Sequence, residues 1–326
     1  MSTQSKKTPS RSRQKSTRNF GIGSRDLTRA GKLFVHSSMR SFSTKGTVSD
    51  RWKVFSDWAK DELGITKMES ITQEVLIKYG GHLKNRIDRG ELQASTAQYY
   101  VSAVNSIMQT ATKGHWESVS PTKDCGIPKR NYLPKISKAM PESQHQQIAG
   151  LVSERVAVMM GLQRLMGLRF KESALIDPQL ALRQALSKGH AVISAGTKGG
   201  RKRNVPVSTD AKIMLERAVK IQDRRSLIPK EMTFVEFRRE CYAIAQKYEF
   251  SFHSERHHYA QQRYLEITGI PAPINTTVQR KKWIDYVSEC LGVDNVQSTE
   301  IDTAAQLKIS DELGHNRAEI TRVYIG

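Results

Sequence analysis

Six side chains in the second half of the sequence have the chemistry needed to transfer a phosphoryl group to a protein hydroxyl. They are two arginines, a lysine, two histidines and a tyrosine: Arg169, Lys198, His253, Arg256, His315 and Tyr324. Attack on a phosphodiester needs charge neutralised on the non-bridging oxygens, a nucleophile, and a proton for the leaving oxygen. Arginine forks can replace metal ions in the first of these roles. The set therefore predicts metal-free chemistry.

The cluster His253, His257 and His258 also allows a metal hypothesis, because residues 253 and 257 would share one face of a helix. A zinc protease needs a glutamate directly after the first histidine, whereas Ser254 stands there, and no third ligand is recognisable. The acidic residues form no Asp-x-Asp motif and no Asp/Glu array beside a histidine. We therefore expect neither a metal nor another cofactor.

The elements that must position these side chains are mostly helical. An apolar helix is expected from about 142 to 166, just before Arg169, and short strands are expected at 191–195 and 203–207. The turn between the strands, 197–200, carries Lys198. Helices are expected again beyond it, so the pattern predicts a mainly α fold with a small β-sheet.

The N-terminal half predicts a separate helical bundle at 25–113. Apolar residues recur at a spacing of three to four from Val48 to Leu63 and from Val75 to Ile87. A third helix is expected to start at the capping box Ser95–Gln98, and a further one is expected over Leu27–Met39.

Two basic segments flank this bundle. Residues 1–24 have no acidic residue and predict a disordered arm, which would either follow DNA phosphates or be a solubilising tail. Residues 114–140 are rich in Gly, Pro and Lys and predict a linker to the second domain, 141–326. In the linker, we expect Lys129, Arg130 and Lys135 to bind DNA.

Charge and composition restrict the class of partner. The 326 residues carry a formal net charge of +20, which attracts polyanions, and nucleic acid is the natural one. Cys125, Cys241 and Cys290 lack the spacing of a disulfide framework or zinc knuckle. No apolar run is long enough for a membrane span or a signal peptide. We expect a cytoplasmic protein with no membrane partner.

Four ordered motifs resemble those of the tyrosine recombinases, the phage-integrase family of site-specific recombinases. They are Gly-Leu-Arg-x-x-Glu at 167–172, Lys-Gly-Gly-x-x-Arg-x-Val-Pro at 198–206, His-x-x-Arg-His at 253–257, and Leu-Gly-His at 313–315 with a tyrosine nine residues later. The resemblance covers the catalytic domain, and the bundle resembles the core-binding domain of the family. It implies a two-domain, C-shaped clamp.

Carried over to this sequence, the resemblance makes Tyr324 the nucleophile of a 3′-phosphotyrosyl intermediate. Arg169 and Arg256 would clamp the scissile phosphate, and Lys198 would protonate the leaving 5′ oxygen. His253 and His315 would assist phosphate binding or proton movement. Glu172 and His257 would orient or pack against these side chains without touching the DNA. The hairpin residues Arg201 and Arg203 are expected to contact DNA.

The resemblance also implies a homotetramer on two DNA attachment sites that integrates or excises a mobile element or prophage. The setting would be a bacterial cytoplasm, at the nucleoid, with accessory DNA-bending or directionality factors as possible partners. A catalytically inactive DNA-binding regulator, a type IB topoisomerase and a telomere resolvase remain alternatives. An active enzyme is favoured because the set of six residues is complete.

Two features depart from the family pattern. Residues 270–303 lengthen the gap between the His-x-x-Arg-His and Leu-Gly-His motifs, as either a DNA- or protein-facing element or a surface insertion. Only Ile325 and Gly326 follow Tyr324, so the C-terminal segment that docks on a neighbouring protomer is not in this sequence. Either the sequence is truncated, or protomers couple through another surface.

Overall fold

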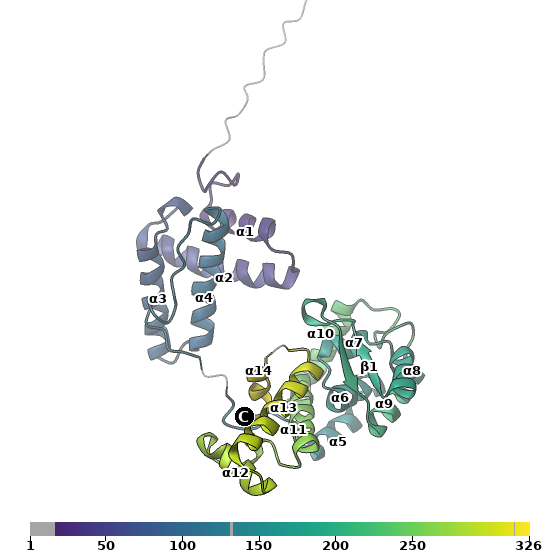
Figure 1. Ribbon diagram of the computed structural model, residues 1–326. Coiled ribbons are helices and arrows are strands. Elements are labelled where there is room, and N and C mark those ends of the chain that lie inside the picture. The colour runs from purple at the N-terminus through teal and green to yellow at the C-terminus, as the bar shows by residue number, and fades with distance from the viewer. Residues whose placement is uncertain (1–16, 131–132, 316) are drawn as a thin grey trace, which may run out of the picture. The chain divides into compact units, whose positions relative to one another are not determined.

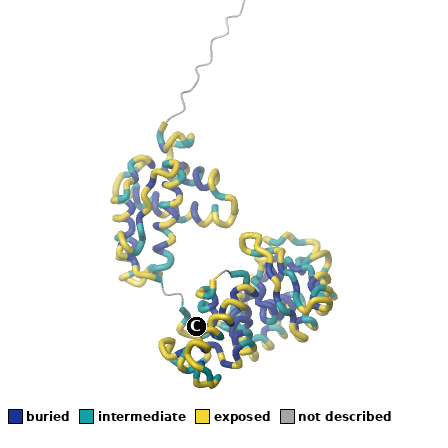
Figure 2. Tube along the Cα trace, in the orientation of Figure 1, coloured by how far each residue is buried: buried dark blue, intermediate teal, exposed yellow. Residues whose placement is uncertain are grey.

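The computed structural model describes residues 17–130, 133–315 and 317–326 and divides the chain into two compact units, Met1–Asn131 and Tyr132–Gly326 (Figure 1). Among the described residues both units are largely helical, and strands occur only as a two-stranded sheet in the second unit. This confirms the predicted mainly α fold with a small β-sheet. Each unit has its own buried core, drawn in dark blue in Figure 2.

The first unit is a helical bundle. Its helices are α1 (Leu27–Ser38), α2 (Phe42–Leu63), α3 (Gln73–Asp88) and α4 (Ala94–Ala111), with a short 3-10 turn η1 (Met68–Ser70). The apolar stripes of these helices meet around Trp52, which is fully buried. A Cβ at Gly31 would lie 2.1 Å from the Trp52 ring, so α1 can approach α2 this closely only with glycine there.

The start of α4 differs from the expected capping box at 95–98. The helix begins at Ala94, and its N-cap is Gln93, whose side chain makes no capping hydrogen bond. The Gln93 carbonyl instead accepts the first helical bonds, from Thr96 N (2.9 Å) and Ala97 N (3.1 Å). The capping-box prediction is therefore wrong, because Ser95 already lies inside the first turn.

Segments on either side of the bundle pack onto it. The Asn19 side chain is buried and its Oδ1 accepts a hydrogen bond from Met68 N (2.7 Å). Near the other end, Asn105 Oδ1 accepts from Trp116 Nε1 (2.9 Å) and Val119 N (3.0 Å). Residues 17–24 of the expected arm and most of the expected linker thus belong to the first unit. Residues 1–16 of that arm lie outside the described residues.

The second unit is built around a buried helix, α6 (Glu154–Met166). Its helices are α5 (Glu142–Leu151), α6 (Glu154–Met166), α7 (Phe170–Leu175), α8 (Pro178–Lys188), α9 (Thr209–Ile221), α10 (Phe234–Lys247), α11 (Phe252–Thr268), α12 (Trp283–Leu291), α13 (Asn295–Glu312) and α14 (Ala318–Ile325). Strands β1 (His190–Ile193) and β2 (Arg203–Pro206) form an antiparallel hairpin in which Ala191 pairs with Val205. A 3-10 turn, η2 (Lys198–Gly200), lies between them.

The apolar stretch at 142–166 forms two helices, where the sequence pattern predicted one. Val152 ends α5 in an extended conformation, and Ser153 then caps α6 by accepting a hydrogen bond from Val156 N (3.4 Å). Apolar periodicity continues through this break, so it gave no signal for it. Helix α6 is buried on almost all sides and packs against α9 and α11.

Glycine ends α6 and directs the chain towards α7. Gly167 has a positive φ of 59°, and a Cβ there would lie 2.5 Å from the Tyr259 ring. Both facts demand glycine. Arg169 follows as the N-cap of α7. In the part of the chain that the structure describes, no helix is both long and apolar enough to cross a membrane.

Candidate active site

Arg169 is held at the start of α7 by Glu172. The Glu172 carboxylate accepts hydrogen bonds from Arg169 N (2.7 Å) and from Arg169 Nη1 (2.8 Å). The Arg169 side chain remains 21% exposed. The side chain is therefore partly open to solvent, while its backbone and one guanidinium nitrogen are fixed by Glu172.

Arg203 is buried, and its guanidinium is already occupied. Arg203 Nη1 and Nη2 donate to the two oxygens of Glu172 at 2.8 Å each, and Nε donates to Glu312 O at 2.6 Å. Its expected role in DNA contact does not fit this position, because binding DNA would break a buried ion pair. The alternation of the strand explains the difference: Arg203 shares the inward face of β2 with Val205.

Burial alone would raise the pKa of Glu172, but the hydrogen bonds and charge of Arg203, together with Arg169, hold it below its usual value. The carboxylate thus stays ionised and continues to bind both arginines. Through it, the hairpin strand β2 is tied to the turn that carries Arg169.

Arg256 lies on α11 and is completely buried. Its Nη1 donates to Gly167 O, and its Nη2 donates to Leu313 O (2.5 Å). The Arg256 guanidinium thus links the turn after α6 to the turn after α13 through hydrogen bonds. Burial lowers the Arg256 pKa to about 10, which leaves it cationic at neutral pH.

The hydroxyl of Tyr324 lies between Arg256 and His315. Arg256 Nε donates to Tyr324 Oη (3.4 Å), Arg256 Nη2 donates to His315 Nε2 (3.2 Å), and Tyr324 Oη is 3.4 Å from the same His315 nitrogen. An arginine can only donate, so His315 Nε2 must be the unprotonated nitrogen of a neutral ring. It can therefore also accept the proton of the tyrosine hydroxyl.

Electrostatics favour the same state of His315. Desolvation, followed by the charges of Arg256 and Arg169, lowers the His315 pKa to about 3. The charges of Arg203 and Lys198 act in the same direction. The ring is therefore neutral throughout the physiological pH range, and its one acceptor nitrogen, Nε2, lies within reach of both Arg256 Nη2 and the Tyr324 hydroxyl.

Two further histidines pack on the Tyr324 ring. The ring centroids of His257 and His253 lie 4.8 and 5.6 Å from that of the tyrosine. His257 is buried, its Nδ1 makes no hydrogen bond, and its pKa is lowered to about 4, chiefly by burial. His253 is exposed on one side, yet desolvation of its packed side, followed by the neighbouring His257 and Arg256, lowers its pKa to about 4.

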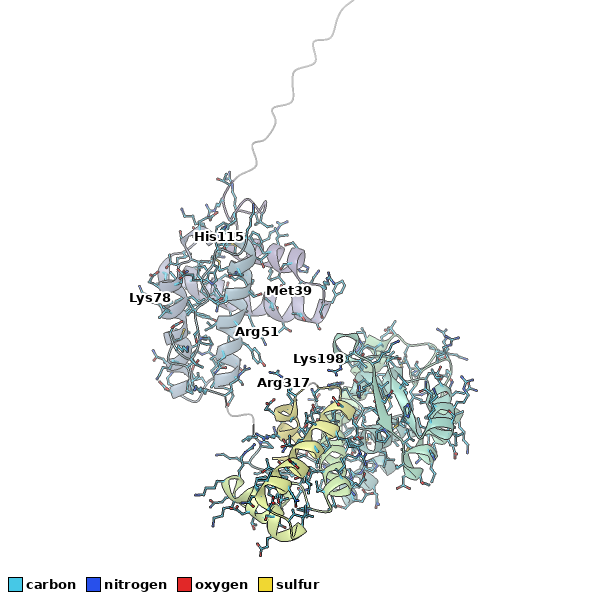
Figure 3. All side chains as sticks on the ribbon, in the orientation of Figure 1. Met39, Arg51, Lys78, His115, Lys198 and Arg317 are labelled. Carbon is cyan, nitrogen blue, oxygen red and sulfur yellow. The ribbon has the colours of Figure 1, made fainter. Side chains whose placement is uncertain are left out.

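Lys198 lies on the exposed turn η2 at the tip of the hairpin, and its side chain projects away from the ribbon (Figure 3). The structure thus brings five of the six predicted residues together and places Lys198 on a neighbouring exposed loop. Among the expected DNA-contacting residues, Lys129, Lys135 and Arg201 are exposed. Arg130 is half-buried and its guanidinium lies 4.9 Å from the centroid of the Tyr99 ring.

Within the described residues, no group of three or more His, Cys, Asp or Glu side chains is arranged to hold a metal ion. His258 does not share a site with His253 and His257. It lines a 560 Å³ pocket with Arg164 and Glu142. The three histidines of the sequence cluster therefore do not form one site.

The sequence interpretation missed Gln261 and Glu312. Gln261 Nε2 donates to Tyr324 O (2.9 Å), so it holds the backbone of the tyrosine. Its spacing of four residues from His257 on α11 was an available signal. Glu312 accepts from Tyr259 Oη (2.9 Å) and binds Arg263, and no local pattern indicated this long-range contact.

One comparison matches part of the second unit to a known family. Residues 133–262 match the family model described as "Integrase". No curated protein matches the sequence.

Several solved structures share the fold at low sequence identity. The Tn1549 transposon integrase in complex with a circular intermediate DNA has a TM-score of 0.57 and 13% identity, covering 93% of this chain and 96% of its own. A lambda integrase tetramer bound to a Holliday junction has a TM-score of 0.52 and 14% identity, covering 84% and 76%. The XerH site-specific recombinase bound to palindromic difH substrate has a TM-score of 0.53 and 13% identity, covering 92% and 80%.

Proposed function

We propose that this chain, which belongs to the tyrosine recombinase (phage integrase) family, is a site-specific DNA recombinase that works through a 3′-phosphotyrosyl intermediate. The observation that carries the proposal is the position of the Tyr324 hydroxyl, 3.4 Å from both Arg256 Nε and His315 Nε2. A nucleophile, a cation and a proton acceptor thus come together in one chain.

In the first step, the scissile phosphate would bind between Arg169 and Arg256 and would replace the backbone carbonyls of Gly167 and Leu313 as acceptors of the Arg256 guanidinium. The charges of both arginines would offset the negative charge that grows on its non-bridging oxygens. Tyr324 Oη would attack phosphorus and pass its proton to His315 Nε2. A bond forms between Tyr324 Oη and phosphorus, and the bond between phosphorus and the 5′ oxygen of the next nucleotide breaks. One phosphodiester replaces another, so no external energy source is needed.

The leaving 5′ oxygen needs a proton, because an alkoxide is a poor leaving group at neutral pH. Lys198 would supply it from the exposed hairpin once DNA is bound. In the reverse direction a 5′ hydroxyl from the same or a second duplex would attack the phosphotyrosine. Attack from a second duplex would exchange strands.

Strand exchange between two duplexes would need an active protomer for each of the four strands. We therefore include in the proposal a homotetramer on two DNA sites, with insertion or excision of a mobile element as its result. The tetrameric lambda integrase on a Holliday junction supports this assembly by its similar fold. Accessory DNA-bending factors would be additional partners.

The test is covalent capture. The chain, Tyr324→Phe and the exposed-tyrosine control Tyr242→Phe are expressed in cells, which are lysed in detergent with a metal chelator, and protein-linked DNA is sequenced. We expect adducts at a discrete site for wild type and Tyr242→Phe, and none for Tyr324→Phe. Equal background from wild type and Tyr324→Phe, with DNA binding intact, would support a binding-only regulator instead.

The nearest enzymatic alternatives differ in their products. A topoisomerase would relax supercoiled DNA without a second site, and a telomere resolvase would leave hairpin ends. Incubating purified protein with plasmids that carry one or two copies of the captured site distinguishes them. A recombinase yields joined or excised circles only when two sites are present.

A further inference from the structure

The segment at 270–303, which the sequence pattern marked as an insertion, is built into the core of the second unit. It comprises the 3-10 turns η3 (Pro273–Asn275) and η4 (Arg280–Lys282), all of α12 and the first half of α13. Trp283 of α12 is only 5% exposed. Helix α13 packs along α14, which carries Tyr324, and η3 also contacts α14. The segment therefore supports the nucleophile helix (Figure 1).

A buried carboxylate, Asp302, lies at the centre of this support. Its Oδ1 accepts hydrogen bonds from Tyr264 Oη (2.5 Å) and Trp283 Nε1 (3.2 Å), and its Oδ2 accepts from Gln306 Nε2 (2.6 Å). No cation in the described chain forms an ion pair with it at salt-bridge distance. An ionised carboxylate can only accept, so each neighbour must present a donor.

This requirement fixes the orientation of the Gln306 amide. With its nitrogen turned to Asp302, its Oε1 accepts a hydrogen bond from Arg322 Nε (3.0 Å). The backbone carbonyl of Gln306 also accepts a hydrogen bond from Thr321 Oγ1 (2.9 Å). Arg322 and Thr321 lie on α14, two and three residues before Tyr324. Gln306 thus links the buried carboxylate to the nucleophile helix.

The far end of α14 is confined as well. A Cβ at Gly326 would lie 2.8 Å from Ile274 N of η3. Helix α14 is therefore held at Arg322 by α13 and abutted at its end by the same segment.

We propose that Asp302 is a positioning residue for the nucleophile. It orients the Gln306 amide, the amide holds Arg322, and Arg322 fixes the register of α14 that places the Tyr324 hydroxyl beside Arg256. The catalytic part of this inference rests on the proposed function, whereas the hold on α14 does not.

The test exploits the difference between a carboxylate and an amide. In Asp302→Asn, the oxygen must stay towards Trp283 Nε1, which can only donate, so the new NH₂ faces Gln306. Gln306 must then flip to accept it, and its own NH₂ meets the donor Arg322. The hold on α14 is lost although side-chain volume barely changes.

A second change should repair the first. In Asp302→Asn with Gln306→Glu, the new carboxylate at position 306 accepts from both the new amide at position 302 and Arg322, which restores the link and the total charge. Gln306→Glu alone puts two carboxylates in contact and should loosen α14. Glu300→Gln removes one charge from the exposed face of the same helix and is the matched control.

Two readouts keep this proposal separate from the proposed function. Hydrogen exchange of the 318–326 peptide in the DNA-free full chain should rise about tenfold in Asp302→Asn and return to the wild-type rate in the double variant. The rate of covalent adduct formation on the captured DNA site should fall roughly ten- to a hundredfold and be restored likewise. Glu300→Gln should change neither.

A variant at the other end of the link guards against simple misfolding: Arg322→Met should slow adduct formation as Asp302→Asn does, and combining the two should add little. If Asp302→Asn leaves α14 exchange unchanged, or if Gln306→Glu fails to rescue it, the positioning role is wrong. If α14 exchange behaves as expected but wild type forms no adduct, the proposed function fails and the hold on α14 stands.

Discussion

Burial is the main cause of the neutral state of the histidines around Tyr324. His315 and His257 are both neutral at pH 7, with pKa values lowered to about 3 and about 4. For His315, the consequence is chemical, because a neutral ring beside Arg256 can accept a proton from Tyr324. For His257, which makes no hydrogen bond through Nδ1, the consequence is stability.

The first prediction concerns this stability. In the unfolded chain His257 has its ordinary pKa of 6.5, against about 4 when folded, so between these values the unfolded state binds more protons. Stability must then fall as the pH drops through that window, by about 2 kcal/mol from pH 7 to 5 for this residue alone. His257→Phe should flatten the loss by about that amount.

The measurement uses the cysteines. Cys241 is buried in the second unit and Cys125 in the first. The urea midpoint at which Cys241 becomes accessible to a pyridyl disulfide reagent, read by mass spectrometry at each pH, reports the second unit, and Cys125 is the internal control. Parallel pH curves for wild type and His257→Phe would contradict the prediction.

The second prediction concerns Lys198. If it protonates the leaving 5′ oxygen, Lys198→Ala should slow strand cleavage by about 10²–10⁴-fold. A substrate with sulfur in place of that oxygen should recover most of the rate, because a thiolate leaves without a proton. The assay is single-turnover adduct formation on both substrates.

Lys202→Ala is the matched control for this prediction, since Lys202 is also exposed and follows the same turn. It should cleave both substrates at nearly the wild-type rate. Equal slowing of Lys198→Ala on oxygen and sulfur substrates would instead mean that the lysine binds DNA and does not act as the acid.

At the scale of elements, the hairpin carries two arginines in different environments, one buried in strand β2 and one exposed just before it. Arg203 faces inward and is bound by Glu172, whereas Arg201 is exposed just before the strand. Arg203→Met leaves a buried carboxylate with only Arg169 as its cation, and we expect a loss of about 3–5 kcal/mol, by analogy with other broken buried pairs. Arg201→Met should change stability by less than about 0.5 kcal/mol.

The urea midpoint of Cys241 accessibility measures both variants. The two variants should also differ in DNA binding. Arg201→Met is expected to weaken binding, and if Arg201 contacts a phosphate, the slope of the logarithm of the binding constant against the logarithm of the salt concentration should become shallower by about one. A stable Arg203→Met protein would mean that the Glu172 pair contributes little to the fold.

Local patterns predicted most of these elements but few of their partners. The stripes of α2 and α3 and the hairpin around Lys198 followed from spacing, because burial on one face imposes a period on the sequence. The break at Ser153 and the start of α4 at Ala94 did not, since each depends on a few local hydrogen bonds. Long-range partners such as Glu312 had no sequence signal, because nothing local records which segments meet.

The same limit applies to the candidate site. Six of its residues were named from the types that phosphoryl transfer requires and from motifs that resemble a known family, and their catalytic roles stay predictions. Gln306 and Asp302 could not be predicted, because their proposed role depends on the direction of a hydrogen bond that forms only after α13 and α14 pack together.

At the scale of the whole molecule, the net charge of +20 determines how the chain should bind DNA. Each phosphate neutralised by Lys or Arg releases condensed counterions, so the binding constant falls steeply with salt. With about six to ten such contacts, affinity should drop about 10³–10⁵-fold between 50 and 200 mM salt. The Tyr324→Phe chain, measured by equilibrium titration of labelled duplex, gives this slope without cleavage.

Two exposed lysines make this final prediction specific to residues. Lys129 lies in the first unit and Lys135 in the second, so Lys129→Gln and Lys135→Gln should each lower the slope by about one if both units contact phosphates. Their effects should add, because the two contacts are independent. If only one of the two substitutions changes the slope, phosphate contact near these residues is confined to a single unit, and the other lysine adds only to the long-range attraction of the net charge, which speeds association but fixes no register on the duplex.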